Sequence, residues 1–174
     1  MSQHIVITEY NPEWTARFER ESVLIKSILK ENCAAVYHIG STAVYGLKAK
    51  PVIDIMPVVY DLRKVDDLAN EFIKEGYEYL GEFGIAGRRY LRKGGDERTH
   101  QIHIFDVTNK ADIERHLAVR DFLRANDEIA DAYGKLKQKL AALFPYDIDG
   151  YCIGKESFVK DLERKAIEWK ANNR

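Results

Sequence analysis

The sequence predicts an α+β fold, in which a mixed β-sheet carries flanking helices and is followed by a helical C-terminal part. Three observations lead to this fold class. Residues 52–60 form a nearly continuous apolar run, which is typical of a central strand. Two β-rich segments, 88–92 and 98–107, flank a turn that begins at Gly94 and predict a hairpin. Beyond residue 109 the apolar residues recur at helical spacing, so helices replace strands.

The N-terminal part is expected to supply an edge strand and the first helix. Residues 5–8 are β-branched and few, as in a short edge strand. Pro12 follows Asn11, a favourable N-cap, and it suits the first helical position because its missing N–H would be unpaired there. Apolar residues at spacings of four and seven then predict an amphipathic helix over 12–30.

Around the central strand, the chain is expected to form two further strands and one helix. Asp61 is a suitable cap for the helix, and Gly76 is a suitable residue to end it. A short aromatic segment follows and reads as a strand. The predicted ranges are 35–39 for a strand, 62–75 for the helix and 77–80 for the aromatic strand.

The last third of the chain is expected to be helical. Helices are predicted over 111–124 and 127–144, and a loop over 145–154. A last helix is marked by four apolar residues at helical spacing, Phe158, Leu162, Ala166 and Trp169. We therefore expect one domain over 1–174, with a sheet-containing core over about 1–108 and C-terminal helices over about 109–174.

Composition excludes several classes of protein. The 174 residues are 45% hydrophobic and 32% charged, as in an ordinary globular protein, and the net charge of −1 argues against a nucleic-acid partner. Two cysteines, Cys33 and Cys152, are too few for a disulfide framework or a four-thiolate zinc site. No segment approaches the roughly 20 apolar residues of a membrane span. We also expect no signal peptide in residues 1–8, and hence a cytoplasmic protein.

One group of residues, Gly40, Ser41 and Asp54, indicates a possible binding or catalytic site. Asp54 lies inside the apolar strand, and a buried carboxylate needs a metal ion, a basic side chain or several donors as its partner. The preceding strand ends in Gly40 and Ser41, which offer a close backbone approach and a hydroxyl, and twelve residues separate Ser41 from Asp54. The turn could hold a phosphate while Asp54 binds the cation that bridges it. The alternative is a structural acid paired with Lys50 or an arginine of the hairpin.

The residues between His38 and Val59, HIGSTAVYGLKAKPVIDIMPVV, resemble the signature of the GrpB family, and the spacing from Gly40 to Asp54 resembles the nucleotidyltransferase superfamily of the polymerase-β type. Further similar segments are Gly87 to Tyr90, the hairpin strand through His103 and Ile104, Arg120 to Leu123, Tyr151 to Lys155, and Phe158. The resemblance implies a nucleotidyltransferase-like fold and a nucleotide site, with a nucleoside triphosphate as ligand and Mg²⁺ or Mn²⁺ as cofactor. GrpB-like domains also occur fused to dephospho-coenzyme A kinase, which leaves a folding or regulatory role open.

The sequence departs from that superfamily at one carboxylate. Active members hold two divalent ions with two carboxylates on one strand face, but the residue two positions after Asp54 is Met56, whose thioether is a poor ligand for Mg²⁺. On the later strand, Gln101, His103 and Phe105 share one face, so His103 is a candidate for the third ligand and for the catalytic base. One carboxylate and one histidine suit a single ion, including Mn²⁺ or Zn²⁺, or no metal at all.

Basic residues supply candidates for phosphate contacts. Lys50, Arg88 and Arg89 are the main ones, because arginine binds phosphate in a bidentate geometry. On the period of two, Arg88 and Arg89 point to opposite faces, so only one of them is expected to reach the site. Arg120 and Lys155 are weaker candidates, read first as solvated charges.

Two other motifs are set aside. Asp147 and Asp149 resemble an Asp-x-Asp pair, but they lie in the predicted loop after Pro145 and are read as turn or cap residues. No Gly-x-x-x-x-Gly-Lys-Ser/Thr pattern is present, so a P-loop kinase is excluded.

Two functions follow from these residues. The first is transfer of a nucleotidyl group to an unknown acceptor, with Asp54 and His103 as catalytic and metal-binding residues. The second is a non-catalytic module that binds a nucleotide, a coenzyme or another phosphorylated small molecule, or that acts as a folding or regulatory partner related to dephospho-coenzyme A kinase. A protein partner is left open, and a third, weaker hypothesis is an interaction protein that uses its C-terminal helices, whose apolar residues core packing already explains.

Overall fold

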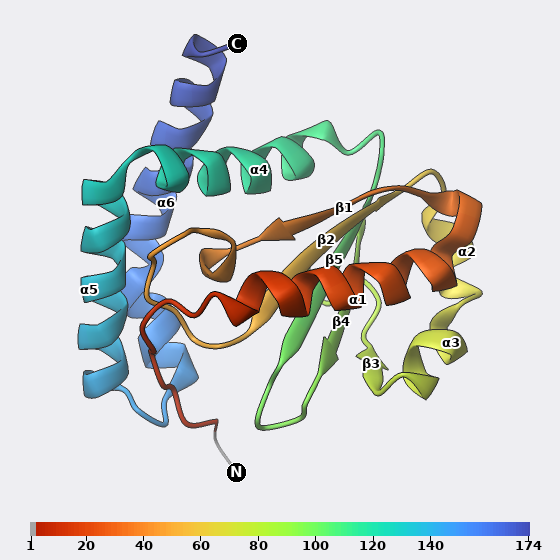
Figure 1. The fold of residues 1–174 in the computed structure, drawn as a ribbon, viewed down its shortest axis with the longest axis horizontal. Helices are drawn as coiled ribbons and strands as arrows, with labels where there is room; N and C mark the ends of the chain where they lie inside the picture. The colour runs from red at the N-terminus through yellow and green to blue at the C-terminus, as the bar shows by residue number, and fades with distance from the viewer. Residues whose placement is uncertain (1–2) are drawn as a thin grey trace.

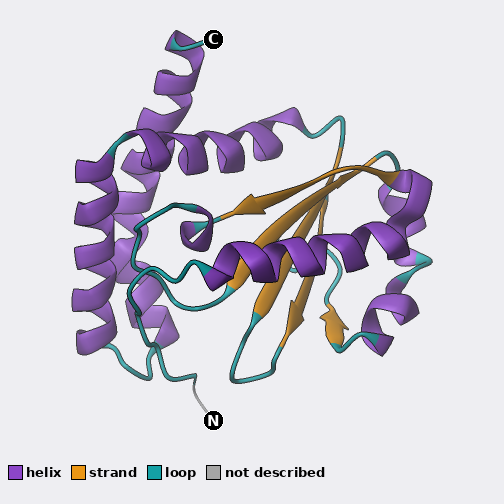
Figure 2. Cartoon of the chain, in the orientation of Figure 1, coloured by secondary structure: helices purple, strands orange, loops and turns teal. Residues whose placement is uncertain are grey.

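The computed structural model describes residues 3–174 and confirms the predicted fold class (Figures 1 and 2). Five strands form one sheet in the order β1-β2-β5-β4-β3. Strands β2 and β5 pair in parallel and all other pairs are antiparallel, so the sheet is mixed. In chain order the elements are α1 (Glu13–Leu29), β1 (Cys33–Ile39), β2 (Ile53–Val59), α2 (Leu62–Asp66), α3 (Ala69–Lys74), β3 (Tyr77–Tyr79), β4 (Arg88–Lys93), β5 (His100–Asp106), α4 (Lys110–Ala125), α5 (Asp127–Leu143) and α6 (Ile148–Asn172).

The first three helices bury one face of the sheet. Figure 1 shows α1 lying across the strands, with α2 and α3 beside its C-terminal end. Alternate residues of β2, β5 and β4 point toward these helices, and because each strand has a period of two they form a continuous apolar layer. The fully buried members of this core include Trp14, Ile25, Ile53, Ile55, Phe72, Leu91, Ile102 and Ile104. This face is filled by packing, so a ligand site has to lie elsewhere.

The opposite face is covered by α4 over only part of its area. There Met56 and Phe105 form a small buried cluster with Ile39, and Ile113 and Leu117 of α4 pack against it. Helices α4, α5 and α6 pack on one another around a core of their own, which also takes up the segment between β1 and β2. As Figures 1 and 2 show, these three helices stand at the end of the sheet where β1 finishes and β2 begins. The uncovered part of the face therefore borders the C-terminal helices.

Two predicted elements near the sheet differ in the structure. Residues 5–8 do not join the sheet, because they bond to loops instead: the Ile5 N–H donates to the carbonyl of Pro145 (2.8 Å), and Thr8 forms an isolated bridge with Ala49. The helix expected over 62–75 is interrupted, so that α2 and α3 are separate and α3 packs against β3. The Asp61 cap is confirmed, since its side chain accepts the Arg63 N–H.

The predicted loop over 145–154 is wrong, because α6 already begins at Ile148. Its glycines allow close packing between helices rather than a loop. A Cβ on Gly154 would sit 2.4 Å from Cδ2 of Leu140, and one on Gly150 would sit 2.6 Å from Cδ1 of Phe144. Asp147 is the N-cap of α6 and accepts the Gly150 N–H at 3.0 Å, which confirms its reading as a cap.

No helix within residues 3–174 is both long and apolar enough to cross a lipid bilayer.

Candidate functional site

A cavity of about 210 Å³ lies where the end of β1 meets β2, β5 and the C-terminal helices. Four predicted site residues line it together, namely Gly40, Ser41, Lys50 and Asp54. The sequence separates these residues by up to fourteen positions, and antiparallel pairing of Ile39 with Asp54 brings them into contact. The complete lining is Gln3, Gly40, Ser41, Thr42, Ala49, Lys50, Val52, Asp54, Gln101, Tyr133, Lys137, Tyr151 and Lys155.

Gly40 is required because the Asp54 carboxylate lies directly against it. A Cβ at position 40 would sit 2.8 Å from Oδ2 of Asp54 and 3.1 Å from its Cβ. Gly40 also has a φ of +73°, a conformation that residues with a side chain rarely adopt. The turn then continues into the short 3₁₀ segment Ser41–Ala43, which directs Ser41 into the cavity. The absence of a side chain at Gly40 thus leaves room for the Asp54 carboxylate.

Asp54 is held by His103, as the shared strand face predicts. His103 Nε2 lies 3.2 Å from Oδ1 of Asp54, and its Nδ1 lies 3.4 Å from Nη1 of Arg88. Because a guanidinium can only donate, Nδ1 must accept, and the ring proton is assigned to Nε2. His103 therefore donates to Asp54 and orients its carboxylate, while Arg88 sets the tautomer.

The carboxylate of Asp54 fits one divalent cation that is shared with a ligand. Mg²⁺ is usually held by one or two carboxylates together with substrate phosphates and waters, so the single carboxylate of Asp54 could hold it only together with a phosphate-bearing ligand. His103 could bind a metal through Nε2 only by moving its proton to Nδ1, against the Arg88 donor. No cluster of three or more His, Cys, Asp or Glu ligands occurs in the part of the chain that the structure describes.

Position 56 cannot contribute a second carboxylate. Met56 points to the same side of β2 as Asp54, but it is fully buried and packs against Ile39 and Phe105 under α4. An ionised acid at this position would be enclosed by apolar groups and would be strongly unfavourable. The packing of α4 on the sheet therefore requires an apolar residue at the position where the two-carboxylate pattern has an acid.

Lys137 of α5 is buried at the floor of the cavity. It is 3% exposed, and its Nζ donates to Oγ of Ser41 at 2.8 Å. The Nζ also lies 4.5 Å from the centre of the Tyr133 ring. Burial, together with the charges of Lys155 and Lys50, lowers the pKa of Lys137 from its usual value to about 7. An anion in the cavity would reverse this effect and restore the charged form.

Two more lysines, Lys50 and Lys155, add positive charge to the lining of the cavity. The Nζ atoms of Lys50 and Lys155 lie 5.2 and 5.0 Å from the centre of the Tyr151 ring. Burial and the nearby Lys50 lower the pKa of Lys155. Tyr151 itself is fully buried, and its hydroxyl has no hydrogen-bond partner among residues 3–174. Three lysines and one carboxylate thus line the same cavity, and the lysines could balance the charge of a multiply charged anion.

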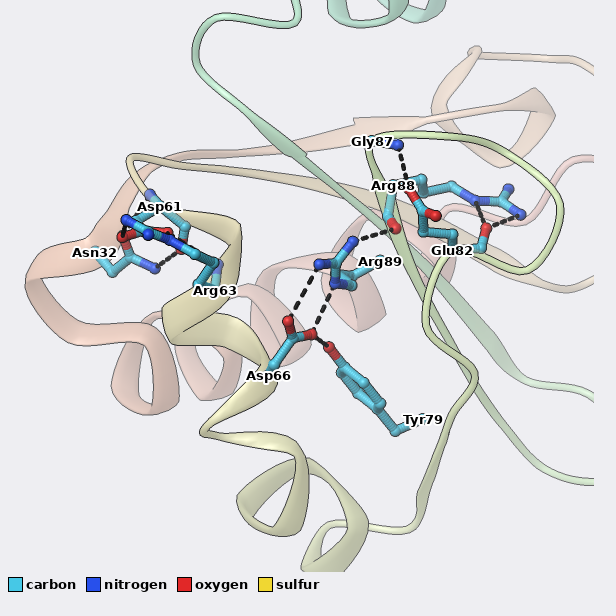
Figure 3. A network of polar contacts seen from close by, with 9 residues as sticks. All are labelled: Asn32, Asp61, Arg63, Asp66, Tyr79, Glu82, Gly87, Arg88 and Arg89. Atoms are coloured by element: carbon cyan, nitrogen blue, oxygen red, sulfur yellow. Dashed lines mark hydrogen bonds and ion pairs between the residues drawn. The ribbon is translucent and has the colours of Figure 1, made fainter.

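The structure does not bring Arg89 to this cavity. Arg89 points to the helix-covered face of the sheet, where its Nε donates to Oδ1 of Asp66 at 2.7 Å and Tyr79 donates to the same carboxylate (Figure 3). The physical reason is the strand period of two, which places the side chain of Arg88 on the site face and that of Arg89 on the other. Arg89 is therefore half of a structural ion pair.

Arg88 lies on the site face but does not line the cavity either. Its Nη2 donates to the carbonyls of Phe83 (2.9 Å) and Glu82 (3.3 Å), and Figure 3 shows the guanidinium bent toward Glu82. Arg88 therefore acts on the site through His103. Arg120 is also engaged structurally, since it donates to the carbonyl of His38 at 3.3 Å and pairs with Asp121.

Lys155, which sequence analysis reads first as a solvated charge, and Lys137, which it does not single out, both line the cavity. Lys155 is not a solvated charge, because the start of α6 faces the cavity. Lys137 carried a readable signal. It lies four residues after Tyr133 and three before Leu140, within the apolar stripe of the predicted helix. A lysine in a buried stripe has to face either a carboxylate or a cavity.

Several known proteins are similar to this chain along most of its length. A family model described as GrpB protein matches residues 4–165. The UPF0157 protein YqkA of Bacillus subtilis is 41% identical over 166 residues, which are 95% of this chain and 48% of that protein. A dephospho-CoA kinase of Mycolicibacterium paratuberculosis is 26% identical over 184 residues, covering 91% of this chain and 45% of the kinase. The chain thus spans about half the length of these two relatives.

Solved structures share the fold. The GrpB protein of Enterococcus faecalis is 50% identical and superposes with a TM-score of 0.92, over 95% of this chain and 99% of that one. The Cid1 poly(U) polymerase with Mg 3′-dATP bound is 16% identical, with a TM-score of 0.50 over 71% of this chain and 40% of the polymerase. The second likeness concerns the fold alone, which is the nucleotidyltransferase type that the resemblance predicted.

Proposed function

This chain belongs to the GrpB family, and from that premise we propose that its cavity binds the phosphate chain of a nucleoside triphosphate with one divalent cation, for transfer of the nucleotidyl group to an acceptor. The observation that carries the proposal is the convergence of three lysines on the Gly40–Ser41 turn beside a single carboxylate, Asp54. Asp54 pairs with His103 and Lys137 bonds to Ser41, so a structural ion pair between this carboxylate and Lys137 does not account for the arrangement.

In this proposal, the Gly40–Ser41 turn and the three lysines contact different parts of the phosphate chain. Ser41 and Lys137 are hydrogen-bonded to one another and offer a hydroxyl and an ammonium to one phosphate group. Lys50 and Lys155, both close to the Tyr151 ring, balance the remaining negative charge. A cation bound by Asp54 would neutralise charge on the transferred phosphoryl group. His103 holds the Asp54 carboxylate in place for that ion.

The proposed reaction is an in-line displacement. The oxygen of an acceptor hydroxyl forms a bond to the α-phosphorus, the bond from that phosphorus to the bridging oxygen breaks, and pyrophosphate leaves with the electron pair. The hydroxyl proton passes to water. In this arrangement the leaving pyrophosphate is the part held by Ser41 and the lysines, which stabilise the charge that develops on it.

One observation favours a second candidate, a module that binds the nucleotide without turnover. Met56 fills the place of a second carboxylate with apolar packing, so the metal set is smaller than in a two-ion site. Binding needs fewer carboxylates than catalysis. The similarity to a dephospho-CoA kinase along 91% of this chain agrees with a coenzyme-related ligand for such a module.

Thermal denaturation of the full chain with ATP or tripolyphosphate, each with and without Mg²⁺ or Mn²⁺, tests the proposal. A ligand at about 100 times its Kd adds roughly 2.7 kcal/mol to stability. We expect a metal-enhanced increase in Tm that Asp54→Asn reduces and Lys137→Gln abolishes. Arg89→Gln is the matched control, because its charge faces away from the cavity.

Release of pyrophosphate separates the two candidates. Wild type that binds ATP and releases pyrophosphate with added hydroxyl compounds, while Asp54→Asn binds but does not turn over, supports transfer. Binding with no release under any condition supports the second candidate. An unchanged Tm with every ligand, or equal shifts in the Lys137→Gln variant, refutes the phosphate site itself.

A further inference from the structure

A second cavity, of about 130 Å³, adjoins the phosphate cavity at the turn that follows β1. The two cavities share three lining residues, Gly40, Ser41 and Tyr133. The rest of the second cavity is lined by one face of α4, from Arg115 to Leu123, and by one face of α6, from Val159 to Glu163. These two helices pack on one another beside the end of β1 (Figure 1). We call this space the α4–α6 cavity.

The walls of the α4–α6 cavity are mostly aliphatic. Leu123 and Leu162 belong to the core of the C-terminal helices, whereas Val119 and Val159 are only half-buried beside the open space. A cavity of about 150 Å³ takes up one benzene ring. The α4–α6 cavity, at about 130 Å³, therefore has room for one six-membered ring and is small for the two fused rings of a purine.

The charged side chains that line the α4–α6 cavity already have partners within the protein. Arg115 contacts Asp112 at 3.1 Å and Glu163 at 3.4 Å, and Arg120 contacts Asp121 at 2.8 Å. The three lysines of the phosphate cavity differ, because they form no ion pair within residues 3–174. A ligand that spans both cavities should therefore place its charges on the lysines and an uncharged part between α4 and α6.

His116 gives the α4–α6 cavity a neutral hydrogen-bonding group. Its ring centroid lies 5.9 Å from that of His103 and 5.8 Å from that of Phe105, but it forms no hydrogen bond within residues 3–174. Burial, together with the charges of Arg115 and His103, lowers the pKa of His116 to about 3, so the ring is uncharged at neutral pH. A neutral imidazole offers one donor and one acceptor, which can pair with the donors and acceptors on the edge of a nucleobase.

The α4–α6 cavity lies on the side of Asp54 to which the nucleoside would extend. Ser41 and the lysines hold the leaving pyrophosphate in the proposed function, and Asp54 faces the transferred phosphoryl group. His103 lies 3.2 Å from Asp54, and the next ring beyond it is that of His116, which lines the cavity. A nucleotide with its phosphates on the lysines can thus direct its base between α4 and α6.

We propose that the α4–α6 cavity binds the base of the nucleotide and that this base is a pyrimidine, which lies against Val119 and Val159 with its polar edge at His116. The inference rests on the proposed function, since the phosphate chain anchors the ligand in the neighbouring cavity. Val159 is a specificity-determining residue, because it lines the α4–α6 cavity and not the phosphate cavity. The preferred ligands are then UTP and CTP rather than ATP and GTP.

The test is isothermal titration calorimetry of the full chain with Mg²⁺, against UTP, CTP, ATP, GTP and tripolyphosphate. We expect UTP and CTP to bind at least about tenfold more tightly than ATP, GTP or tripolyphosphate, because only the smaller base is buried. Val159→Phe fills the cavity and should abolish this preference without changing tripolyphosphate binding, whereas Val159→Ala enlarges the cavity and should improve ATP and GTP binding. Ile167→Phe is the matched control, since Ile167 is 48% exposed on the same helix and lines neither cavity.

Tripolyphosphate binding tests the phosphate cavity, and the preference among nucleotides tests the α4–α6 cavity. If tripolyphosphate binds, then equal binding of all four nucleotides, tighter binding of ATP or GTP, or a pyrimidine preference that survives Val159→Phe overturns the base site alone. If tripolyphosphate does not bind, the proposed function fails, and NMR titration with uridine then tests the cavity by itself. Shifts at Val119 and Val159 that Val159→Phe abolishes would support the base site, and their absence would overturn it as well.

Discussion

Replacing Lys137 with methionine tests whether the buried ammonium group lowers the folding stability of the chain in the absence of a ligand. The substitution keeps the length of the side chain and removes its ammonium. Burial holds the pKa of Lys137 at about 7 rather than 10.5. A difference of that size corresponds to about 5 kcal/mol that opposes folding when the lysine is charged in both states. This figure is an upper bound, because local relaxation and water entry reduce it.

The direction in which stability changes with pH follows from the pKa of Lys137 in the folded and in the unfolded chain. Below pH 7 the folded and unfolded chains both carry a charged Lys137, and the whole penalty is present. Between pH 7 and about 10 the folded chain binds fewer protons than the unfolded chain, so wild-type stability rises with pH by up to about 1.4 kcal/mol per unit. Above the unfolded pKa the penalty is gone.

Lys137→Met should therefore be more stable than wild type at pH 6. Loss of the hydrogen bond to Ser41 offsets about 1 kcal/mol of the gain. The net increase is expected to be about 2–4 kcal/mol, or roughly 5–15 °C in Tm for a chain of this length. The advantage should shrink as pH rises to 9, and the variant should no longer be stabilised by tripolyphosphate.

The assay is urea denaturation of wild type and variant at pH 6, 7.5 and 9, followed by circular dichroism. Lys139→Met is the control, because Lys139 is an exposed lysine on the same helix. A Lys137→Met variant that is less stable than wild type at pH 6 refutes the reasoning. So does an advantage of the same size at all three pH values, since the effect would then not come from charge.

Three further changes test the site and its surroundings. Gly40→Ala should cost about 2–4 kcal/mol in urea denaturation and weaken tripolyphosphate binding, because its Cβ would press on Asp54. Burial lowers the pKa of His38 to about 4, so the chain should lose about 2–3 kcal/mol between pH 7 and 4.5, and His38→Gln should lose less. Met56→Glu should cost more than about 3 kcal/mol in the same assay, since Met56 is fully buried.

Each of these three predictions has a control that distinguishes the stated physical cause from other causes of lost stability. Gly46→Ala has a similar positive φ of +78° with no atom within 4 Å, so an equal cost in both glycine variants would exclude a clash as the reason. If His38→Gln and wild type lose the same stability in acid, titration of this ring is not responsible. Met56→Leu should cost less than about 1.5 kcal/mol, and a Met56→Glu chain as stable as Met56→Leu would show that the position tolerates a carboxylate.

The strands and most of the helices could be predicted because their signals are local. The period of two in β5 placed His103 on one face with Gln101 and Phe105, and the structure brings His103 to Asp54 as that face requires. The Asp61 cap was equally readable, because capping involves a side chain and a backbone N–H two residues apart. At the start of α6 the same reasoning failed, since Gly150 and Gly154 indicate a turn by composition but lie in the helix and allow it to pack closely.

The sheet strands, the Gly40–Ser41 turn, the half-buried Asp54 and the missing carboxylate at Met56 could be read from the sequence, since each depends on neighbours along the chain. Only the tertiary structure decided which charges meet. Lys137 lies 96 positions from the serine that it contacts, and Arg89 turns to Asp66 rather than to the phosphate cavity. The physical reason is that hydrogen bonding along a helix or strand sets the direction of a side chain, whereas the partner that it finds depends on how whole elements pack.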